Sequence, residues 1–312
     1  MMKKLILTLL LTLFAAPICF ASDNYIAYAS DKKTVKSEKQ QLQTLEKEVK
    51  ATLKKQLAYT NSYDIDGLKS LYSANYLNAD GFDKTMYFDL VDKTWNLYPD
   101  IKYSMNIDSI NIVGNTAIVS VTEYATASTK EKVDEIEIKG YLKSYSDTIY
   151  YLEKVGSNWL ITSDSIISEE TKLTYGEANE IKTELIVPQL VPANKEYTAS
   201  LKITVPDKKM LLIASIGQEK ITYPHENALE VYRKLPESGI LERVFKANKD
   251  NLNEYTVASV GITRAHVSKD KEIKLVVTGL GYIITRTNVI SLKDFSKVKV
   301  DGKKETTAKL VD

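Results

Sequence analysis

The sequence predicts an α+β protein in two parts: a conical domain of helices on a curved antiparallel sheet, and then an all-β sandwich. Two observations support this prediction. Helix-like patterns open the chain and give way to strand-like alternation from Ile101, and every segment beyond Ile181 is strand-like. Helices followed by strands are typical of α+β folds. About seven short strands in about 110 residues are typical of a sandwich.

The first predicted helix starts at Ser37. Its apolar residues recur at three- and four-residue spacing, which places them on one face of an α-helix. Asn61 to Gly67 ends the pattern, so an amphipathic helix docked on a sheet is favoured over a coiled coil. The stripe consists of Leu42, Leu45, Val49, Leu53 and Leu57.

Two further helices are predicted from their capping residues. Asp64 and Asp83 each precede an amphipathic stretch, and Asp is a preferred N-cap residue. Asp80-Gly81 is a turn between the two helices, and Pro99 ends the second one. The inward face of that helix is predicted to carry Tyr87, Leu90, Val91, Thr94 and Tyr98.

Strands follow from Ile101, and glycine turns predict two hairpins. One hairpin turns at Gly114-Asn115 and the other at Gly156-Ser157-Asn158. Between them we predict separate strands at 133–145 and 149–154, and the second hairpin continues to Ile167. This half is expected to contain about four to six antiparallel strands with helices on one face.

These patterns divide the chain into five segments, with the domain boundary between Glu169 and Ile181. The polar ends are expected to be loose. The predicted segments are a signal peptide (1–21), a linker (22–36), the α+β domain (37–175), the sandwich (176–300) and a flexible tail (301–312).

The charge balance excludes one class of function. The chain has 42 basic and 41 acidic residues, a formal net charge of +1. Arginine, which nucleic-acid readers use for phosphates and base edges, is scarce. We therefore predict no nucleic-acid partner. The arginines are Arg233, Arg243, Arg264 and Arg286.

The first 21 residues have the pattern of a secretory leader. Lys3 and Lys4 precede an apolar run from Leu5 to Phe14, and small residues at Cys19 and Ala21 fit cleavage after Ala21. The run is short for a membrane span, although an uncleaved anchor stays an alternative. We expect a secreted or periplasmic protein without cysteine and without a transmembrane segment after the leader is removed.

The first half resembles the nuclear-transport-factor-two-like superfamily, which also contains polyketide-cyclase-like (SnoaL-like) and ketosteroid-isomerase-like proteins. The resemblance extends from Glu38 to Tyr175. It rests on the three helices, Asp80-Gly81-Phe82, the two hairpins, and the closing Trp159-Leu160-Ile161. It implies a pocket between helices and sheet, where some relatives use a carboxylate or His with Tyr or Asp as an enzyme site.

The second half resembles a bacterial immunoglobulin-like sandwich. The stretch from Asn251 to Val257 is spaced like a tyrosine corner, with Tyr255 as the tyrosine. The cysteine pair of that fold is absent, since Val257 stands at the second cysteine's place. This departure leaves the strand topology open.

Aromatic residues of the first half are the candidate ligand site, because aromatics and a few polar groups line small-molecule pockets. The alternative is that they are ordinary core. No catalytic residue is assigned: Asp64 and Asp66 suit capping, and Asp108 and Glu123 are strand carboxylates whose default is solvent. The candidate ligand-binding residues are Tyr72, Tyr76, Trp95, Tyr103, Tyr124 and Trp159.

No sequence motif predicts a cofactor or a metal. Gly279 and Gly281 form a lone G-x-G with no helix after it, so a nucleotide loop is not expected. His225 and His266 are isolated and lie outside the first half, and their spacing suggests no metal site.

Three functions stay open. The first is a non-enzymatic, exported, envelope-associated protein that binds a small apolar ligand or a protein partner. The second is an isomerase- or dehydratase-type enzyme that uses a carboxylate and a Tyr in the pocket. The third is a structural or adhesion module whose cone is filled by its own side chains. The sequence does not define the oligomeric state.

The leader generates a first prediction. Mature protein recovered after export is expected to begin near Ser22, because the leader has the three regions that signal peptidase recognises. Intact-mass spectrometry of exported protein tests this. Retention of Met1 to Ala21, or a lipid on Cys19, would refute the prediction.

Overall fold

The computed structural model describes most of the chain between the leader and the tail. The predicted signal peptide, the first part of the linker and the predicted tail lie outside the described residues. None of the described helices combines the length and the apolar character needed to cross a membrane. The described residues are 32–133, 138–204, 210–224, 231–267 and 273–295.

Three helices precede the sheet, namely α2 (Lys32–Ser62), α3 (Ile65–Ser70) and α4 (Lys84–Leu97). Both predicted N-caps are confirmed: the Asp64 carboxylate accepts from the Gly67 amide and the Asp83 carboxylate from the Met86 amide, each at 2.9 Å. The predicted linker was wrong at its end, since α2 already begins at Lys32. No Gly or Pro stands between that residue and Ser37 to stop the helix.

The first half of the main sheet is an antiparallel meander. It consists of β1 (Lys102–Val113), β2 (Thr116–Val133), β3 (Ile138–Val155) and β4 (Asn158–Gly176). Both predicted hairpins are confirmed, with Gly114 and Gly156 at φ +60° and +62°. Residues 138–145 of the first expected strand and 149–154 of the second form the single strand β3, because no Gly or Pro interrupts Ser146 to Thr148. Val133 ends β2, and 134–137 lie outside the described residues.

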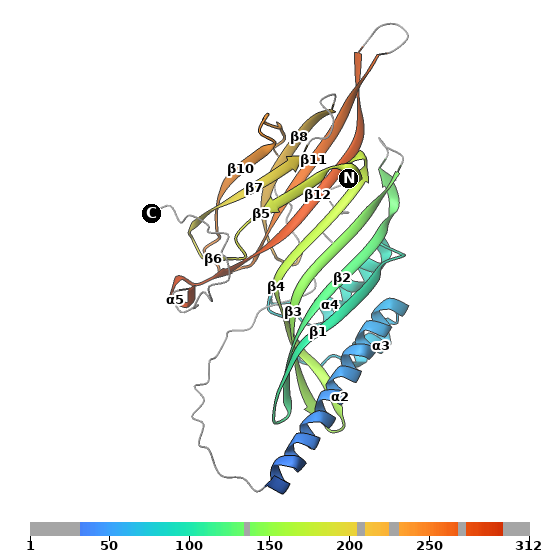
Figure 1. The fold of residues 1–312 in the computed structure, drawn as a ribbon, viewed down its shortest axis with the longest axis vertical. Coiled ribbons are helices and arrows are strands. Elements are labelled where there is room, and N and C mark those ends of the chain that lie inside the picture. The colour runs from blue at the N-terminus through green and yellow to red at the C-terminus, as the bar shows by residue number, and fades with distance from the viewer. Residues whose placement is uncertain (1–31, 134–137, 205–209, 225–230, 268–272, 296–312) are drawn as a thin grey trace.

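The same sheet continues into the second half of the chain (Figure 1). Strand β12 (Ile273–Ile290) pairs with β4, Gly279–Thr285 against Gly176–Glu170. Among the described residues the main sheet has nine strands: β1-β2-β3-β4-β12-β11-β8-β9, with β6 pairing β12. The added strands are β11 (Glu254–Val267), β8 (Met210–Lys220), β9 (Arg233–Lys234) and β6 (Leu190–Pro192).

A three-stranded sheet covers one face of this extension. It has the order β10-β7-β5. The strands are β10 (Ile240–Lys246), β7 (Glu196–Thr204) and β5 (Lys182–Ile186), and two short helices, η2 (Glu177–Glu180) and α5 (Leu292–Phe295), complete the described elements.

The main sheet is buried on both faces where its two halves meet. In β11, Tyr255 and Val257 belong to the core under the helices, whereas Ala258 and Val260 belong to the core under the small sheet. Strand β11 is therefore buried at every position from Glu254 to Ile262. Its polar residues Glu254, Thr256 and Ser259 are buried together with the apolar ones.

The shared sheet bears on the predicted two-domain division. Strand β4 crosses the predicted boundary, and one layer of the expected sandwich is an extension of the first half's sheet. The tyrosine-corner expectation is not confirmed, and the Tyr255 hydroxyl donates to Glu169 of β4 at 3.0 Å. Separate folding of 37–175 and 176–300 stays a prediction, and the strand pairing across the boundary favours cooperative folding.

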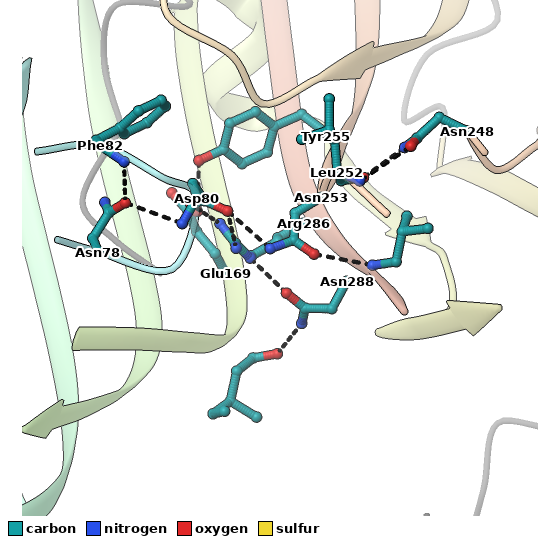
Figure 2. Close-up of polar contacts among 12 residues, drawn as sticks. Asn78, Asp80, Phe82, Glu169, Asn248, Leu252, Asn253, Tyr255, Arg286 and Asn288 are labelled. Atoms are coloured by element: carbon teal, nitrogen blue, oxygen red, sulfur yellow. Dashed lines mark hydrogen bonds and ion pairs between the residues drawn. The ribbon is translucent and has the colours of Figure 1, made fainter. Parts of the chain in front are cut away.

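A buried ion pair joins the second half to the turn before α4 (Figure 2). Arg286 of β12 donates to both oxygens of Asp80, at 2.7 and 3.0 Å. The Arg286 and Asp80 side chains are 0% and 1% exposed. Asn253 also donates to Asp80 at 2.8 Å, and Asn288 accepts from Arg286 at 2.8 Å.

Asn78 fixes the conformation of the turn that carries Asp80. The side chain of Asn78 accepts from the amides of Asp80 and Phe82, at 3.0 and 2.7 Å. Asp83, the N-cap of α4, follows directly. Arg286 thus holds the start of α4 against the main sheet.

We predict that Arg286→Met lowers the free energy of unfolding by about 3–5 kcal/mol, because it leaves the Asp80 carboxylate buried without its cation. The double variant with Asp80→Asn should recover part of this loss. Lys202→Met, at an exposed pair with Glu184, is the control and should change stability by about 0–1 kcal/mol. Urea unfolding measures all three. Equal, small losses for Arg286→Met and Lys202→Met would contradict the prediction.

Candidate functional site

The helices and the sheet of the first half border a partly open cavity of about 60 Å³. One water needs about 10–15 Å³ of such space, so the cavity has room for several waters or a ligand of a few heavy atoms. It is lined by α2 (Gln56, Leu57, Thr60), Leu68 of α3, α4 (Tyr87, Val91), Tyr103 of β1, β2 (Glu123, Tyr124, Ala125) and β3 (Ser144, Ser146, Tyr150).

Glu123 is the carboxylate of this cavity. It lies on β2 in phase with Val121 and Ala125, which are buried under the helices. Its Oε1 accepts a hydrogen bond from the Tyr150 hydroxyl at 3.1 Å. Burial raises the pKa of Glu123 to about 7, and the bond from Tyr150 opposes that shift. Glu123 can therefore gain or lose a proton near neutral pH.

Gln56 of α2 extends this polar contact. Its Nε2 donates to the Tyr150 oxygen at 3.5 Å, so Tyr150 links the carboxamide to the Glu123 carboxyl. Gln56 is 5% exposed, and its Oε1 has no hydrogen-bond partner among the described residues. A buried acceptor without a donor is costly, so this oxygen is available to a ligand or a water.

A second buried carboxyl, Asp164 of β4, lies deeper in the same core. It is 0% exposed, and the Tyr76 hydroxyl lies 3.0 and 3.1 Å from its oxygens. Burial raises the pKa of Asp164 well above its ordinary value. Irregular pairing between β3 and β4 sets its direction: the register shifts next to Tyr151, and Asp164 faces the helices.

Tyr72, Tyr76 and Tyr87 form an aromatic cluster between the cavity and Asp164. The Tyr72 ring lies 5.0 Å from that of Tyr76 and 5.2 Å from that of Tyr87. The hydroxyls of Tyr72 and Tyr87 are 3.1 Å apart. Of the three, only Tyr87 borders the cavity, so Tyr72 and Tyr76 support its wall from behind.

The structure places Tyr103 and Tyr124 at the cavity, with different roles. Tyr103 of β1 borders it from the helix-facing side of the sheet. The Tyr124 ring, by contrast, is 43% exposed and packs on the Tyr145 ring at 5.4 Å. Neighbouring residues of a strand point to opposite faces. Because Glu123 faces the helices, Tyr124 faces away from them.

The two tryptophans lie away from the cavity lining. Trp95 of α4 makes an edge contact with the Tyr63 ring at 5.3 Å. Trp159 donates to the Glu48 carboxylate of α2 at 3.1 Å and so fastens that helix to the start of β4. Both are buried and act as core in this structure.

The other candidate residues do not gather at the cavity. Asp108 is exposed on β1 and accepts from Thr122 at 2.9 Å. Asp64 caps α3, and His266 is exposed at the end of β11. His225 is outside the described residues. Within the described parts of the chain, no three His, Cys, Asp or Glu side chains come close enough together to hold a metal ion.

Sequence reasoning missed Gln56, Tyr150 and Asp164. Gln56 had a detectable signal, because it directly precedes Leu57 of the apolar stripe on α2. Tyr150 alternates in phase with Leu152, which also indicates an inward side chain. Asp164 had no such signal, because simple alternation from Ile161 would have pointed Ser163 inward instead.

Comparisons with known proteins find similar solved structures at low identity. No family model matches the chain, and no curated protein matches it. Similar solved structures include a conserved protein from Planctomyces limnophilus DSM 3776, at 13% identity over 39% of this chain and 94% of that chain, with a TM-score of 0.35. They also include a nuclear transport factor 2 (NTF2-like) superfamily protein from Salmonella enterica serovar Typhimurium, at 13% identity over 40% of this chain and 91% of that chain, with a TM-score of 0.33. A third is a hexachlorocyclohexane dehydrochlorinase, LinA type 2, at 11% identity over 39% of this chain and 84% of that chain, with a TM-score of 0.32.

The buried carboxyls generate a prediction about pH. Burial raises the pKa of Glu169 to about 8, with Asp80 adding to the shift and Arg286 and Tyr255 opposing it. The ordinary value is 4.5, so the folded protein keeps protons on Glu169 and Glu123 that the unfolded chain releases. The free energy of unfolding should therefore fall as pH rises from about 4.5 to about 8.

Urea midpoints at pH 5.5 and 8.5 test this. The midpoint should be lower at pH 8.5, and Glu169→Gln should reduce the difference because Gln cannot ionise. Glu170→Gln, next in sequence but 41% exposed, should leave the difference unchanged. A midpoint that rises with pH in the parent protein would contradict the assignment.

The position of Trp95 gives a second prediction. Trp95→Ala should lower the free energy of unfolding by about 3–5 kcal/mol, as for a core aromatic, because the ring packs in the interior and not against the cavity. Trp95→Phe should cost less, since it keeps a ring against Tyr63. Equilibrium unfolding measures both losses. A loss below about 1 kcal/mol for Trp95→Ala would mean instead that the ring borders a cavity or solvent and is not packed in the core.

Proposed function

We propose that the first half is a binding domain for a very small molecule, held in the cavity beside Glu123. The observation that supports this proposal is an unused acceptor in a polar cavity wall. The side-chain Oε1 of Gln56 has no hydrogen-bond partner within the described parts of the chain, and Glu123 and Tyr150 border the same cavity. The lining differs from the apolar pocket that the sequence suggested, because one wall carries a carboxyl, a carboxamide and hydroxyls.

The size of the cavity limits the affinity. Pockets for drug-sized ligands have about 300–1,000 Å³, several times the 60 Å³ of this one. The best tiny ligands gain about 1.5 kcal/mol per heavy atom. A ligand of three heavy atoms would then bind with a dissociation constant of roughly 1 mM. A metabolite present at high concentration, or the end group of a larger molecule, fits this range.

Export forms part of the proposal and rests on the leader pattern of the sequence. In this reading the second half supports the site, since Arg286 holds the start of α4, and α4 supplies Tyr87 and Val91 to the cavity.

An enzyme is the second candidate, and one contact favours it. A carboxyl with a pKa of about 7 that is hydrogen-bonded to a tyrosine hydroxyl is suited to general acid–base chemistry. If the parent protein turns over a substrate, Glu123→Gln should abolish turnover. The pH–rate profile should then show a base with a pKa near 7.

A substitution that fills the cavity distinguishes a binding domain from a purely structural domain whose interior is already filled by its own side chains. In Ala125→Val the added methyl groups enter open space, so the free energy of unfolding should stay within about 1 kcal/mol of the parent value or rise. Ala117→Val is the matched control on the same strand. It is 0% exposed and does not border the cavity, so overpacking should cost about 1–3 kcal/mol.

Ligand-observed NMR on the same variants completes the test. Ethanol, acetamide, ethylammonium and acetate serve as probes. At least one should bind the parent and Ala117→Val, and none should bind Ala125→Val. Equal destabilisation by the two substitutions, with no probe bound to the parent, would overturn the proposal.

A further inference from the structure

The electrostatics of the cavity narrow the class of ligand. No Lys, Arg or His borders it within the described residues, whereas Glu123 does. An anion would enter a low-dielectric space with no cation to compensate its charge and with a carboxyl beside it. Anion binding in the cavity is therefore unfavourable, and a neutral or cationic ligand is favoured.

Part of the wall offers acceptors to the cavity, while the hydroxyls of Tyr103, Ser144 and Ser146, which also border it, can donate or accept. The Tyr150 hydroxyl uses its hydrogen toward Glu123, and its oxygen receives Gln56 Nε2. The Gln56 oxygen is then left as an unpaired buried acceptor. Thr60 donates its hydroxyl hydrogen to the Gln56 main-chain carbonyl at 2.8 Å, so its oxygen also offers lone pairs. The complement of these acceptors is a ligand rich in donors.

Aromatic rings form another part of the wall. Tyr87, Tyr103 and Tyr150 come from α4, β1 and β3 and all border the cavity. Ring faces attract cations, and desolvated pairs of this kind are the stronger ones. Aromatic walls, a carboxyl and two free acceptors together match the needs of an ammonium group, which has three donors, one charge and no acceptor.

We propose that the cavity takes the protonated amino group of a small primary amine, with the Glu123 carboxylate as its counter-charge and the Gln56 carbonyl oxygen as a second acceptor. This inference rests on the proposed binding function and specifies its ligand class. The aliphatic end of the amine packs on the apolar side of the cavity, formed by Leu57, Leu68, Val91 and Ala125.

Binding of this kind is linked to pH through Glu123. The titratable groups around Glu123 are Tyr72, Tyr87, Tyr103, Tyr150 and Asp164. Burial raises the pKa of each tyrosine above its ordinary value of 10 and that of Asp164 well above 3.8, so the tyrosines stay neutral and Asp164 resists ionisation. An ammonium ligand needs Glu123 ionised, and its affinity should fall about tenfold per pH unit below pH 7.

Two NMR titrations of the protein test the inference, one with ethylammonium chloride and one with ethanol, a neutral molecule of similar size. Both are run at pH 5.5, 7.0 and 8.5. Ethylammonium should bind more tightly than ethanol at pH 8.5 and lose about tenfold or more in affinity by pH 5.5. Ethanol should show little pH dependence. Acetate should not bind at any pH.

Three variants locate the effect. Glu123→Gln should weaken ethylammonium binding at least tenfold and remove its pH dependence. Gln56→Met, which keeps the length but removes the acceptor, should weaken it severalfold. Gln43→Met, on the exposed side of the same helix, is the control and should bind as the parent does. Urea midpoints confirm that each variant is folded, and the Glu123→Gln pH profile decides if Gln56→Met does not fold.

The outcomes separate the two proposals. If ethanol or acetamide binds as well as ethylammonium at all pH values, the amine inference is overturned and the binding function stands. If no probe binds the folded parent protein, both are overturned. If ethylammonium binds equally to Glu123→Gln and to the parent, it binds elsewhere, and the inference fails.

Discussion

The rest of the structure depends on one buried ion pair, Asp80 with Arg286. Removing two charges from water is expensive, and such a pair persists only where geometry and additional hydrogen bonds compensate. Here the guanidinium binds the carboxylate with two hydrogen bonds, and Asn253 and Asn288 take up remaining positions around it. The pair connects residues 206 positions apart in the sequence. It joins the strand that extends the sheet to the turn that starts α4, so a cavity wall in the first half is held by a residue of the second.

Burial sets the protonation of the carboxyls around this pair, because the pair has no positive charge to spare for them. One cation is balanced by one carboxylate, so a second ionised carboxyl in that space would leave an uncompensated charge. Glu169, which is 2% exposed and lies beside Tyr255, accordingly keeps its proton. Glu123 lies farther along the core, where the groups around it carry no positive charge, and burial acts on it directly. Glu169 thus keeps its proton at pH 7, whereas Glu123 titrates near that pH, and a cationic ligand would favour its ionised form.

Local features of this fold could be predicted from the sequence, and features set by distant contacts could not. The caps at Asp64 and Asp83 and the turns at Gly114 and Gly156 are decided by a few neighbouring residues, and all were predicted. The pairing of β4 with β12 brings together residues about 100 positions apart, and nothing in either strand specifies its partner. The same limit applies to the site. Tyr103 was predicted to line the pocket as one of the aromatic residues of the first half, whereas Asp164 faces inward only because the pairing register shifts beside it.

The central claim, that Arg286 holds the cavity wall through Asp80, is tested most directly by amide hydrogen exchange. Exchange rates report local opening of individual elements. In the paired variant Asp80→Asn with Arg286→Met, the amides of α4 from Tyr87 to Val91 should exchange faster than in the parent protein. Those of Val119 and Val121, in the core of β2, should change much less. If α4 stays as protected as β2 in the variant, the helix is held by its own packing and the account of the ion pair is wrong.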